Sequence, residues 1–342
     1  MDSIDPVDPV DVVSLTRALV DIDSTTGREG NAGRWLADYL RRRGFAVTEQ
    51  RVDTSRFNVI AATGEPRVVL STHFDCVPPF FPSRVSGERI HGRGACDAKG
   101  ILAAMVAAAD RLHREGENRV GLVFVVGEER GSDGAFEANK FANRSRFLID
   151  GEPTDNRLGL ATRGVLRLKL RATGRAAHSS FPELGESAID KLLDALIELR
   201  TVTLPSDPLL GRTHYTVGLI AGGVAPNVVS PAAEAEVMFR TVSAADEIRR
   251  AVNVLGSRVA IEDVLEVPPV RLKTVPGFET SVFPFTTDIP FLPAWGEPLL
   301  LGPGSIHLAH TADEYVEIQE LLEAVDHYAA LARALVEARP SA

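Results

Sequence analysis

Residues 101–126 carry the sequence ILAAMVAAADRLHREGENRVGLVFVV. The Ala-rich run at 101–114 predicts a helix, because it keeps apolar residues at helical spacing. Residues 121–126 are apolar at almost every position, as expected of a strand that is buried on both faces. A helix directly before such a strand predicts part of a βαβ unit in a mostly parallel sheet.

Strand and helix patterns extend this unit on both sides. A strand is expected at 67–72 before it, and a helix at about 134–143 and a strand at 147–150 after it. The elements from 67 to 150 thus follow a β-α-β-α-β order, which predicts an α/β fold. Two further helices are expected before them, at about 10–23 and 31–43. The mostly parallel sheet of this fold should be sandwiched between helices on both faces.

The pattern changes near Gly164. Residues 165–172 alternate apolar and basic side chains, which is typical of an antiparallel strand with one exposed face. The elements that follow are expected at 186–200, 215–221, 233–240, 245–255 and 259–265. Their β-α-β-β-α-β order is that of a ferredoxin-like module. We therefore predict an α/β domain formed by residues 1–163 and 270–342, with a smaller α+β domain, residues 164–269, inserted in it.

The composition is that of a globular protein, with 44% hydrophobic and 25% charged residues in a chain of 342. The 37 basic and 47 acidic residues give a net charge of −10, which argues against binding to nucleic acid or to an anionic membrane. Two cysteines are too few for a disulfide-stapled secreted scaffold. No apolar run approaches the roughly 20 residues of a membrane span, and residues 1–9 lack signal-peptide features. We expect a cytoplasmic protein.

Acidic residues and histidines follow the predicted strands or lie in Gly-containing turns ahead of predicted helices. They are His73, Asp75, Asp97, Glu128, Glu129, Glu152 and His310. Ligands of an open parallel sheet bind outside the carboxyl ends of its strands, so these side chains can converge on one crevice. Taken singly, each has an ordinary explanation: the aspartate at 97 as a helix N-cap, the glutamate pair as a solvated loop, and a histidine as a surface residue.

The set as a whole favours metal binding. Five carboxylates directed into one crevice would repel one another unless cations neutralised them. Two divalent ions would bring four positive charges against these five negative ones. Imidazole with carboxylate, and no required thiolate, suits zinc or cobalt, and manganese is also compatible. Two ions need a bridging ligand, and a carboxylate with two oxygens can serve.

Five sequence motifs contain these residues. They are STHFDCVP (71–78), GRGACDAKG (92–100), GEE (127–129), GEPT (151–154) and GPGSIHLAHTADE (302–314). In this order and spacing they resemble the di-zinc amidohydrolase family of acetylornithine deacetylase, succinyl-diaminopimelate desuccinylase, aminoacylase and carboxypeptidase G. The resemblance covers nearly the whole chain. Within the family, the motifs are most similar to those of the acetylornithine deacetylase type.

The resemblance implies a role for each residue of the set. The two zinc sites would consist of His73, Asp97 and Glu152 and of Asp97, Glu129 and His310, with Asp97 bridging. Asp75 would accept the second ring N–H of His73 and fix its tautomer. Glu128 would be the general base that takes a proton from the attacking water and returns it to the leaving amine.

The inserted domain carries further matches to the family. Residues 174–180 resemble a lid segment whose histidine, here His178, stabilises the tetrahedral oxyanion. Asn227 and Arg240 match segments that bind the substrate's α-carboxylate, for which the bidentate fork of arginine is suited. On sequence alone Arg240 is equally well explained as an exposed charge at a strand end. In dimeric members the histidine comes from the partner subunit, so the resemblance leaves room for a homodimer formed through this domain.

The activity that the resemblance implies is zinc-dependent hydrolysis of an N-acyl amino acid, of the acetylornithine deacetylase type. A dipeptidase or carboxypeptidase acting on short peptides could use the same site, and a non-catalytic homologue would bind metal without turnover. Cys76 and Cys96 flank two aspartates of the set and are expected to be packing residues. His307 is expected at the surface or facing substrate, and Asp288 lies in a matching stretch without an assigned role.

Overall fold

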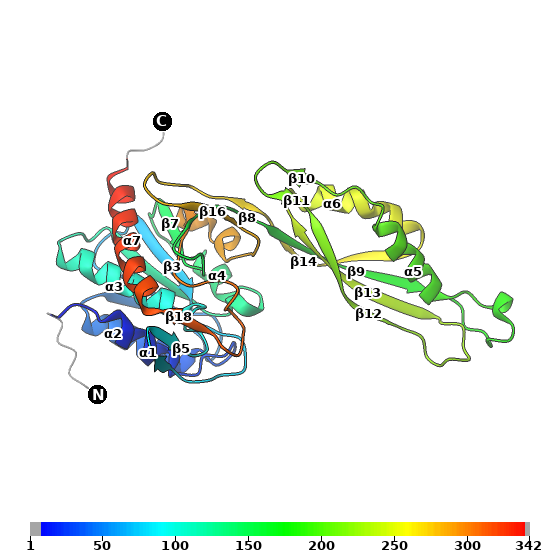
Figure 1. Cartoon of the computed structure of the whole chain (residues 1–342), viewed down its shortest axis with the longest axis horizontal. Helices are drawn as coiled ribbons and strands as arrows, with labels where there is room; N and C mark the ends of the chain where they lie inside the picture. Colours follow the sequence, from blue (N-terminus) through cyan, green and yellow to red (C-terminus); the bar gives the residue numbers. More distant parts are fainter. Residues whose placement is uncertain (1–7, 339–342) are drawn as a thin grey trace. The chain divides into compact units, whose positions relative to one another are not determined.

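The computed structural model describes residues 8–338, which form two compact units (Figure 1). Of the described residues, unit 1 comprises 8–160, Leu272–Ser281 and 287–338. Unit 2 comprises Ala161–Arg271 and Val282–Thr286. Unit 2 is thus formed mainly by one continuous segment that lies, in the sequence, between two parts of unit 1.

Unit 1 is built on a six-stranded sheet. Its strands, in spatial order, are β1 (Ala46–Arg51), β2 (Phe57–Ala62), β6 (Val120–Val125), β3 (Val68–His73), β7 (Phe147–Asp150) and β17 (Glu297–Leu300). From β6 to β17 neighbouring strands are parallel, whereas β2 is antiparallel to both β1 and β6. β3, β6 and β7 are buried at every position, as their continuous apolar runs predict. The predicted α/β fold class with a mostly parallel sheet is confirmed.

Helices cover both faces of this sheet. They are α1 (Val12–Val20), α2 (Gly30–Arg42), α3 (Lys99–Arg114), α4 (Asp133–Ala138) and α7 (Ile318–Glu337). Because alternate residues of a strand face opposite sides, Leu70 packs in the core with α1, α2, α3 and α7, and Val69 packs with α4 and Trp295. Among the described residues, no helix combines the length and the hydropathy that crossing a bilayer requires.

The helix predicted at 134–143 is too long. α4 ends at Ala138, and the next residue, Asn139, is its C-cap. The Asn139 side chain accepts the N–H of Ala294 at 2.8 Å, so it binds a distant loop instead of continuing the helix. Asparagine hydrogen-bonds main-chain groups in this way more readily than it extends a helix.

His310 does not lie just ahead of a helix, as its sequence context suggested. Strand β18 (Tyr315–Glu317) separates it from α7. β18 pairs with β5 (Arg89–His91), which pairs in turn with β4 (Arg84–Ser86). Strands of three residues are too short for a polarity period, so the sequence does not indicate them.

Unit 2 contains a four-stranded antiparallel sheet covered on one face by two helices. In spatial order the strands are β12 (His214–Gly222), β13 (Ala232–Thr241), β9 (Gly164–Thr173) and β14 (Ala260–Val267), and the helices are α5 (Ala188–Leu199) and α6 (Ala245–Val252). β9 alternates buried and exposed residues, as its polarity pattern predicts. The chain order β9-α5-β12-β13-α6-β14 is that of a ferredoxin-like module. The remaining short strands are β8 (Leu158–Thr162), β10 (Ser206–Asp207), β11 (Gly211–Arg212), β15 (Val270–Arg271) and β16 (Thr280–Phe283).

Candidate metal centre

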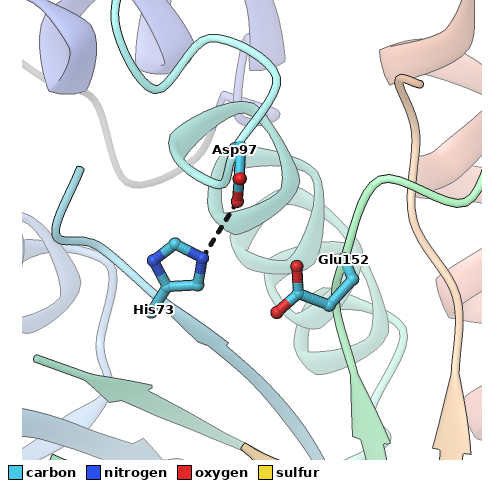
Figure 2. A group of neighbouring side chains, drawn as sticks. All are labelled: His73, Asp97 and Glu152. Atoms are coloured by element: carbon cyan, nitrogen blue, oxygen red, sulfur yellow. Dashed lines mark hydrogen bonds and ion pairs between the residues drawn. The ribbon is translucent and has the colours of Figure 1, made fainter. Parts of the chain in front are cut away.

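Three buried side chains meet beyond the carboxyl ends of β3 and β7 (Figure 2). His73 is the last residue of β3, Glu152 lies two residues after β7, and Asp97 lies in the turn before α3. His73 Nε2 is 3.0 Å from Asp97 Oδ1, and the Glu152 carboxylate points toward both. One ligand atom from each residue lies within 4.8 Å of the other two. The group could hold a metal ion with one imidazole and two carboxylates.

A second group shares Asp97 with the first. His310 Nε2 lies 2.9 Å from Glu129 Oε1 and 3.2 Å from Asp97 Oδ2. These three residues also offer ligand atoms within 4.8 Å of one another. Asp97 therefore presents Oδ1 to His73 and Oδ2 to His310, which places its carboxylate between the two groups. Each group contains one histidine and two carboxylates.

Glu128 and Glu129 are carried by a tight turn at the end of β6. The turn is closed by the Ser132 N–H, which donates to the Gly127 carbonyl at 2.8 Å. Gly127 has a φ of 77°, and an added Cβ there would lie 3.0 Å from the Arg56 guanidinium. Only glycine adopts this backbone conformation at no steric cost, so the sequence Gly-Glu-Glu suits the turn.

Asp75 is fully buried and contacts both the turn of Glu128 and Glu129 and the ring of His73. Its carboxylate accepts the N–H groups of Glu128 and Glu129 at 3.1 and 3.3 Å. It also accepts the Thr26 hydroxyl at 2.8 Å. His73 Nδ1 lies 3.1 Å from the Asp75 carbonyl and 3.4 Å from its carboxylate, so main chain and side chain share the contact expected for the second ring nitrogen. The sequence did not indicate these hydrogen bonds between Asp75 and the main chain of the glutamate turn.

The carboxyl groups of the site are strongly affected by burial. Burial raises the pKa of Glu152 well above its usual range, and the charges of Asp97 and Glu128 add to the shift. Burial likewise raises the pKa of Glu128 well above its usual range, although His73 opposes the shift. Burial would raise the pKa of Asp97 too, but hydrogen bonds with His310 and His73 hold it below its ordinary value.

The pKa values of the two histidines are raised by the carboxylates beside them. Burial disfavours the charge of His73, but hydrogen bonds to Asp75 and Asp97 raise its pKa well above the ordinary value. Hydrogen bonds to Asp97 and Glu129 raise the pKa of His310 to about 10. An imidazole binds a metal ion in its neutral form, so a divalent ion in each group would compete with protons for the histidine. The donor set fits two ions of the zinc type.

Four residues noted in the sequence lie outside both groups. Cys76 and Cys96 are buried free thiols, and Cys96 Sγ contacts the Ser305 carbonyl at 3.4 Å. His307 is exposed. Asp288 is buried, its carboxyl oxygens have no hydrogen-bond partner among residues 8–338, and burial raises its pKa to about 6.

His178 and Asn227 lie close together in unit 2. The Ser179 N–H donates to the Asn227 carbonyl at 3.0 Å, and His178 forms an isolated bridge with Val228. His178 and Asn227 are both exposed. The Ser180 N–H donates to His178 Nδ1 at 3.1 Å, so a neutral imidazole carries its proton on Nε2 and presents a donor there.

Arg240 lies far from this pair within unit 2. It stands near the end of β13, whereas His178 follows Thr173, which pairs with Ala232 at the start of β13. Arg240 lies eight positions after Ala232 along the strand, roughly 26 Å at about 3.3 Å per residue. Arg240 is half-buried, burial lowers its pKa, and it makes no ion pair with any residue that the structure describes. The structure therefore brings His178 and Asn227 together and separates Arg240 from them.

Comparison with known proteins gives matches along most of the chain. The model of peptidase family M20/M25/M40 matches residues 69–334. A peptidase M20 domain-containing protein of Schizosaccharomyces pombe is 39% identical over 331 residues, which cover 93% of this chain and 83% of that protein. A probable carboxypeptidase of Aspergillus terreus is 40% identical over 375 residues, which cover 95% of this chain and 86% of that protein.

A solved structure shares the fold at much lower identity. The aminopeptidase PepT from Bacillus cereus superposes with a TM-score of 0.79 and 19% identity, covering 95% of this chain and 98% of that chain. This similarity shows a common fold. Membership of a family is shown by the family model and by the relatives of higher sequence identity.

Proposed function

The chain belongs to peptidase family M20/M25/M40, and from this premise we propose that it is a two-metal hydrolase whose catalytic centre lies in unit 1. The observation that carries the proposal is the pair of ligand groups joined by Asp97. Each group contains one histidine, and the two oxygens of the shared Asp97 carboxylate are directed at different histidines. A chance cluster of acidic residues would not be expected to have both features. Glu128 directly precedes Glu129, and the charges of His73 and Asp97 act on its carboxyl group, which supports it as the candidate general base.

The ligands of the two ions follow from the two groups. One ion would be held by His73, Asp97 and Glu152, and the other by Asp97, Glu129 and His310. Zinc is the ion we expect from these donors, and cobalt or manganese could replace it. Such ions, when bound, polarise an amide carbonyl and lower the pKa of a water molecule.

Glu128 would act first as general base and then as general acid. It takes a proton from the attacking water and delivers it to the amine nitrogen as the C–N bond breaks. Burial raises its pKa above that of an ordinary glutamate, which makes it a stronger base toward the attacking water. The Asp75 carboxylate, by holding the main chain of the glutamate turn, fixes the direction of Glu128.

For the substrate we place a peptide with a free C-terminal carboxylate first. The Aspergillus terreus relative is named a probable carboxypeptidase, and neither the family model nor the relatives described above support the acetylornithine deacetylase type in particular. An N-acyl amino acid is the second candidate, since its amide also lies next to a free carboxylate and needs the same chemistry. Arg240 or Asn227 would bind that carboxylate.

The experiment is a substrate panel with the zinc- or cobalt-loaded chain and the metal-stripped chain as control. The panel contains dipeptides, the same dipeptides as C-terminal amides, N-acetyl-ornithine, N-acetyl-methionine and N-succinyl-diaminopimelate. We expect metal-dependent cleavage of the free dipeptides but not of their amides. Turnover of acetyl-amino acids alone would assign the chain to the deacylases. Silence across the panel with two ions bound would contradict the proposal and indicate a non-catalytic metal-binding homologue.

We further propose that unit 2 is a lid through which two chains pair. His178 lies beyond the end of the sheet where β13 begins, and Arg240 lies near the other end of β13, so we do not expect one copy of unit 2 to apply both to a single substrate. β12 is an edge strand that exposes Leu219 by 64% and Ile220 by 58%, and an unpaired apolar edge can join a second strand. Leu219→Lys should convert a dimer to a monomer in sedimentation. A wild-type chain that is monomeric at micromolar concentration would contradict the pairing.

A cytoplasmic location is also proposed. Both cysteines are free and buried, which suits a reducing compartment. Cell fractionation would test it, and recovery of the chain with secreted proteins would refute it.

A further inference from the structure

Glu314 is a buried glutamate whose side-chain partners all lie in one short turn. Its Oε1 accepts the N–H groups of Gly94, Cys96 and Asp97 at 2.9, 3.1 and 3.1 Å. Its Oε2 accepts a hydrogen bond from Arg93 Nη1 at 2.6 Å. The residue is only 1% exposed, so its carboxylate has exchanged water for these four donors.

Three N–H groups of the turn that Glu314 binds find their acceptor outside the turn. Gly92 and Gly94 have φ values of 151° and 88°, and α3 begins only at Lys99. The N–H groups of residues 94, 96 and 97 are therefore outside the helix and directed at the Glu314 carboxylate. Buried main-chain donors need an acceptor, and one carboxyl oxygen of Glu314 serves all three here.

The position of Asp97 depends on this arrangement. Its main-chain nitrogen is held by Glu314, and only two side-chain torsions then place its carboxylate. The two oxygens lie 3.0 Å from His73 Nε2 and 3.2 Å from His310 Nε2. A shift of the turn would alter both distances.

Glu314 fastens the His310 segment to the same turn. It follows His310 by four residues, and its carbonyl accepts the Gly92 N–H at 3.1 Å. The next residue, Tyr315, begins β18 and pairs with His91, which directly precedes the turn. Side chain and main chain of one residue thus join the segments that carry Asp97 and His310.

We propose that Glu314 is a positioning residue that sets the geometry of Asp97 relative to His310, and thereby the metal affinity of the group formed by Asp97, Glu129 and His310. The inference rests on the proposed function, because Glu314 has this task only if the group holds an ion. It assigns a role to a residue that lies outside both ligand groups and contacts no reacting atom.

Glu314→Gln is the variant that tests this role. Glutamine keeps the size of the side chain and one oxygen for the three N–H groups, but it turns an NH2 group toward the Arg93 guanidinium, so two donors face each other. Glu317→Gln is the matched control, three residues along the chain. It removes a carboxylate that pairs with the exposed Arg89 at 2.7 Å and contacts neither ligand group.

The measurement is zinc binding to the metal-stripped full chain by competition with a chromophoric chelator. Circular dichroism and thermal unfolding of the same samples report whether the fold is kept. We expect Glu314→Gln to fold and to bind zinc with an affinity lower by roughly 10- to 100-fold at the group that contains His310, the usual effect of altering a partner of a metal ligand. The group of His73 should lose less affinity, because Glu314 acts on it only through the shared Asp97. Glu317→Gln should bind both ions as wild type does.

Two results would overturn the inference while leaving the proposed function standing. One is wild-type affinity for both ions in folded Glu314→Gln. The other is failure of Glu314→Gln to fold, because the role would then be structural. A wild-type chain that binds no second ion is a separate outcome, which would refute the two-metal centre and the inference with it.

Discussion

Replacing Asp75 by asparagine should slow the reaction even when zinc is supplied in excess and both ions are bound. Asp75 Oδ1 accepts the Glu128 N–H, and Oδ2 accepts the Glu129 N–H and the Thr26 hydroxyl. In asparagine one of these two positions becomes an NH2 group, which cannot accept. The Thr26 hydroxyl can rotate to suit either orientation, but a main-chain N–H cannot. One donor of the glutamate turn is therefore left without its acceptor whichever way the amide points.

The size of the effect follows from that lost acceptor. A buried donor left without an acceptor costs about 1–3 kcal/mol. About 1.4 kcal/mol corresponds to a tenfold change in rate. If Glu128 must keep its present position in the transition state, kcat/KM should fall by roughly 5- to 150-fold. The fold should persist, because the hydrogen bonds of β3 and β6 do not involve the Asp75 side chain.

The assay compares kcat/KM of wild type and Asp75→Asn on the best substrate of the panel, with zinc content measured on the same samples. Asp23→Asn is the control, since Asp23 bonds the neighbouring Thr25 and no residue of the glutamate turn. It should stay near wild type. Wild-type kcat/KM in Asp75→Asn would refute the reasoning that Asp75 acts by holding Glu128.

Three further outcomes are expected. Glu128→Gln should retain both ions and lose at least about 100-fold in kcat, the usual contribution of a general base; turnover near wild type would exclude it from that role. His178→Ala should lower kcat without changing zinc content, and an unchanged kcat would remove unit 2 from the oxyanion site. Asp110→Ala removes the carboxylate that lies 2.6 Å from Arg43 Nη2, with both side chains 2% exposed. Because it takes one partner from a buried ion pair, the free energy of unfolding in urea should fall by about 3–5 kcal/mol with kcat unchanged; a variant as stable as wild type would contradict this.

The central strands of unit 1 could be predicted because burial on both faces makes them apolar throughout. β7 begins and ends at the predicted residues, and β3 and β6 are each displaced by one. The pairing of β5 with β18 could not be predicted in this way. It joins Arg89 to Glu317, more than two hundred residues apart in the sequence, and neither strand is long enough to show a period.

The ligand residues of the candidate site could be predicted from the sequence, whereas the contacts that position them could not. Placement after strand ends, together with the family motifs, pointed to the side chains that the structure gathers around Asp97. The acceptors that hold the surrounding turns, Asp75 and Glu314, bind main-chain N–H groups, which are the same in every sequence and leave no motif of their own. The separation of Arg240 from His178 depends on the register of β9 and β13, which the polarity pattern of the two strands does not determine.

The most direct test of the two-metal centre is the number of zinc ions bound per chain, measured for wild type and for Asp97→Asn after metal stripping and reloading. Asp97 is the one residue that both ligand groups share. We expect two ions on wild type and neither retained at full occupancy by Asp97→Asn. One ion or none on wild type, or two on Asp97→Asn, would contradict a centre built around a shared aspartate.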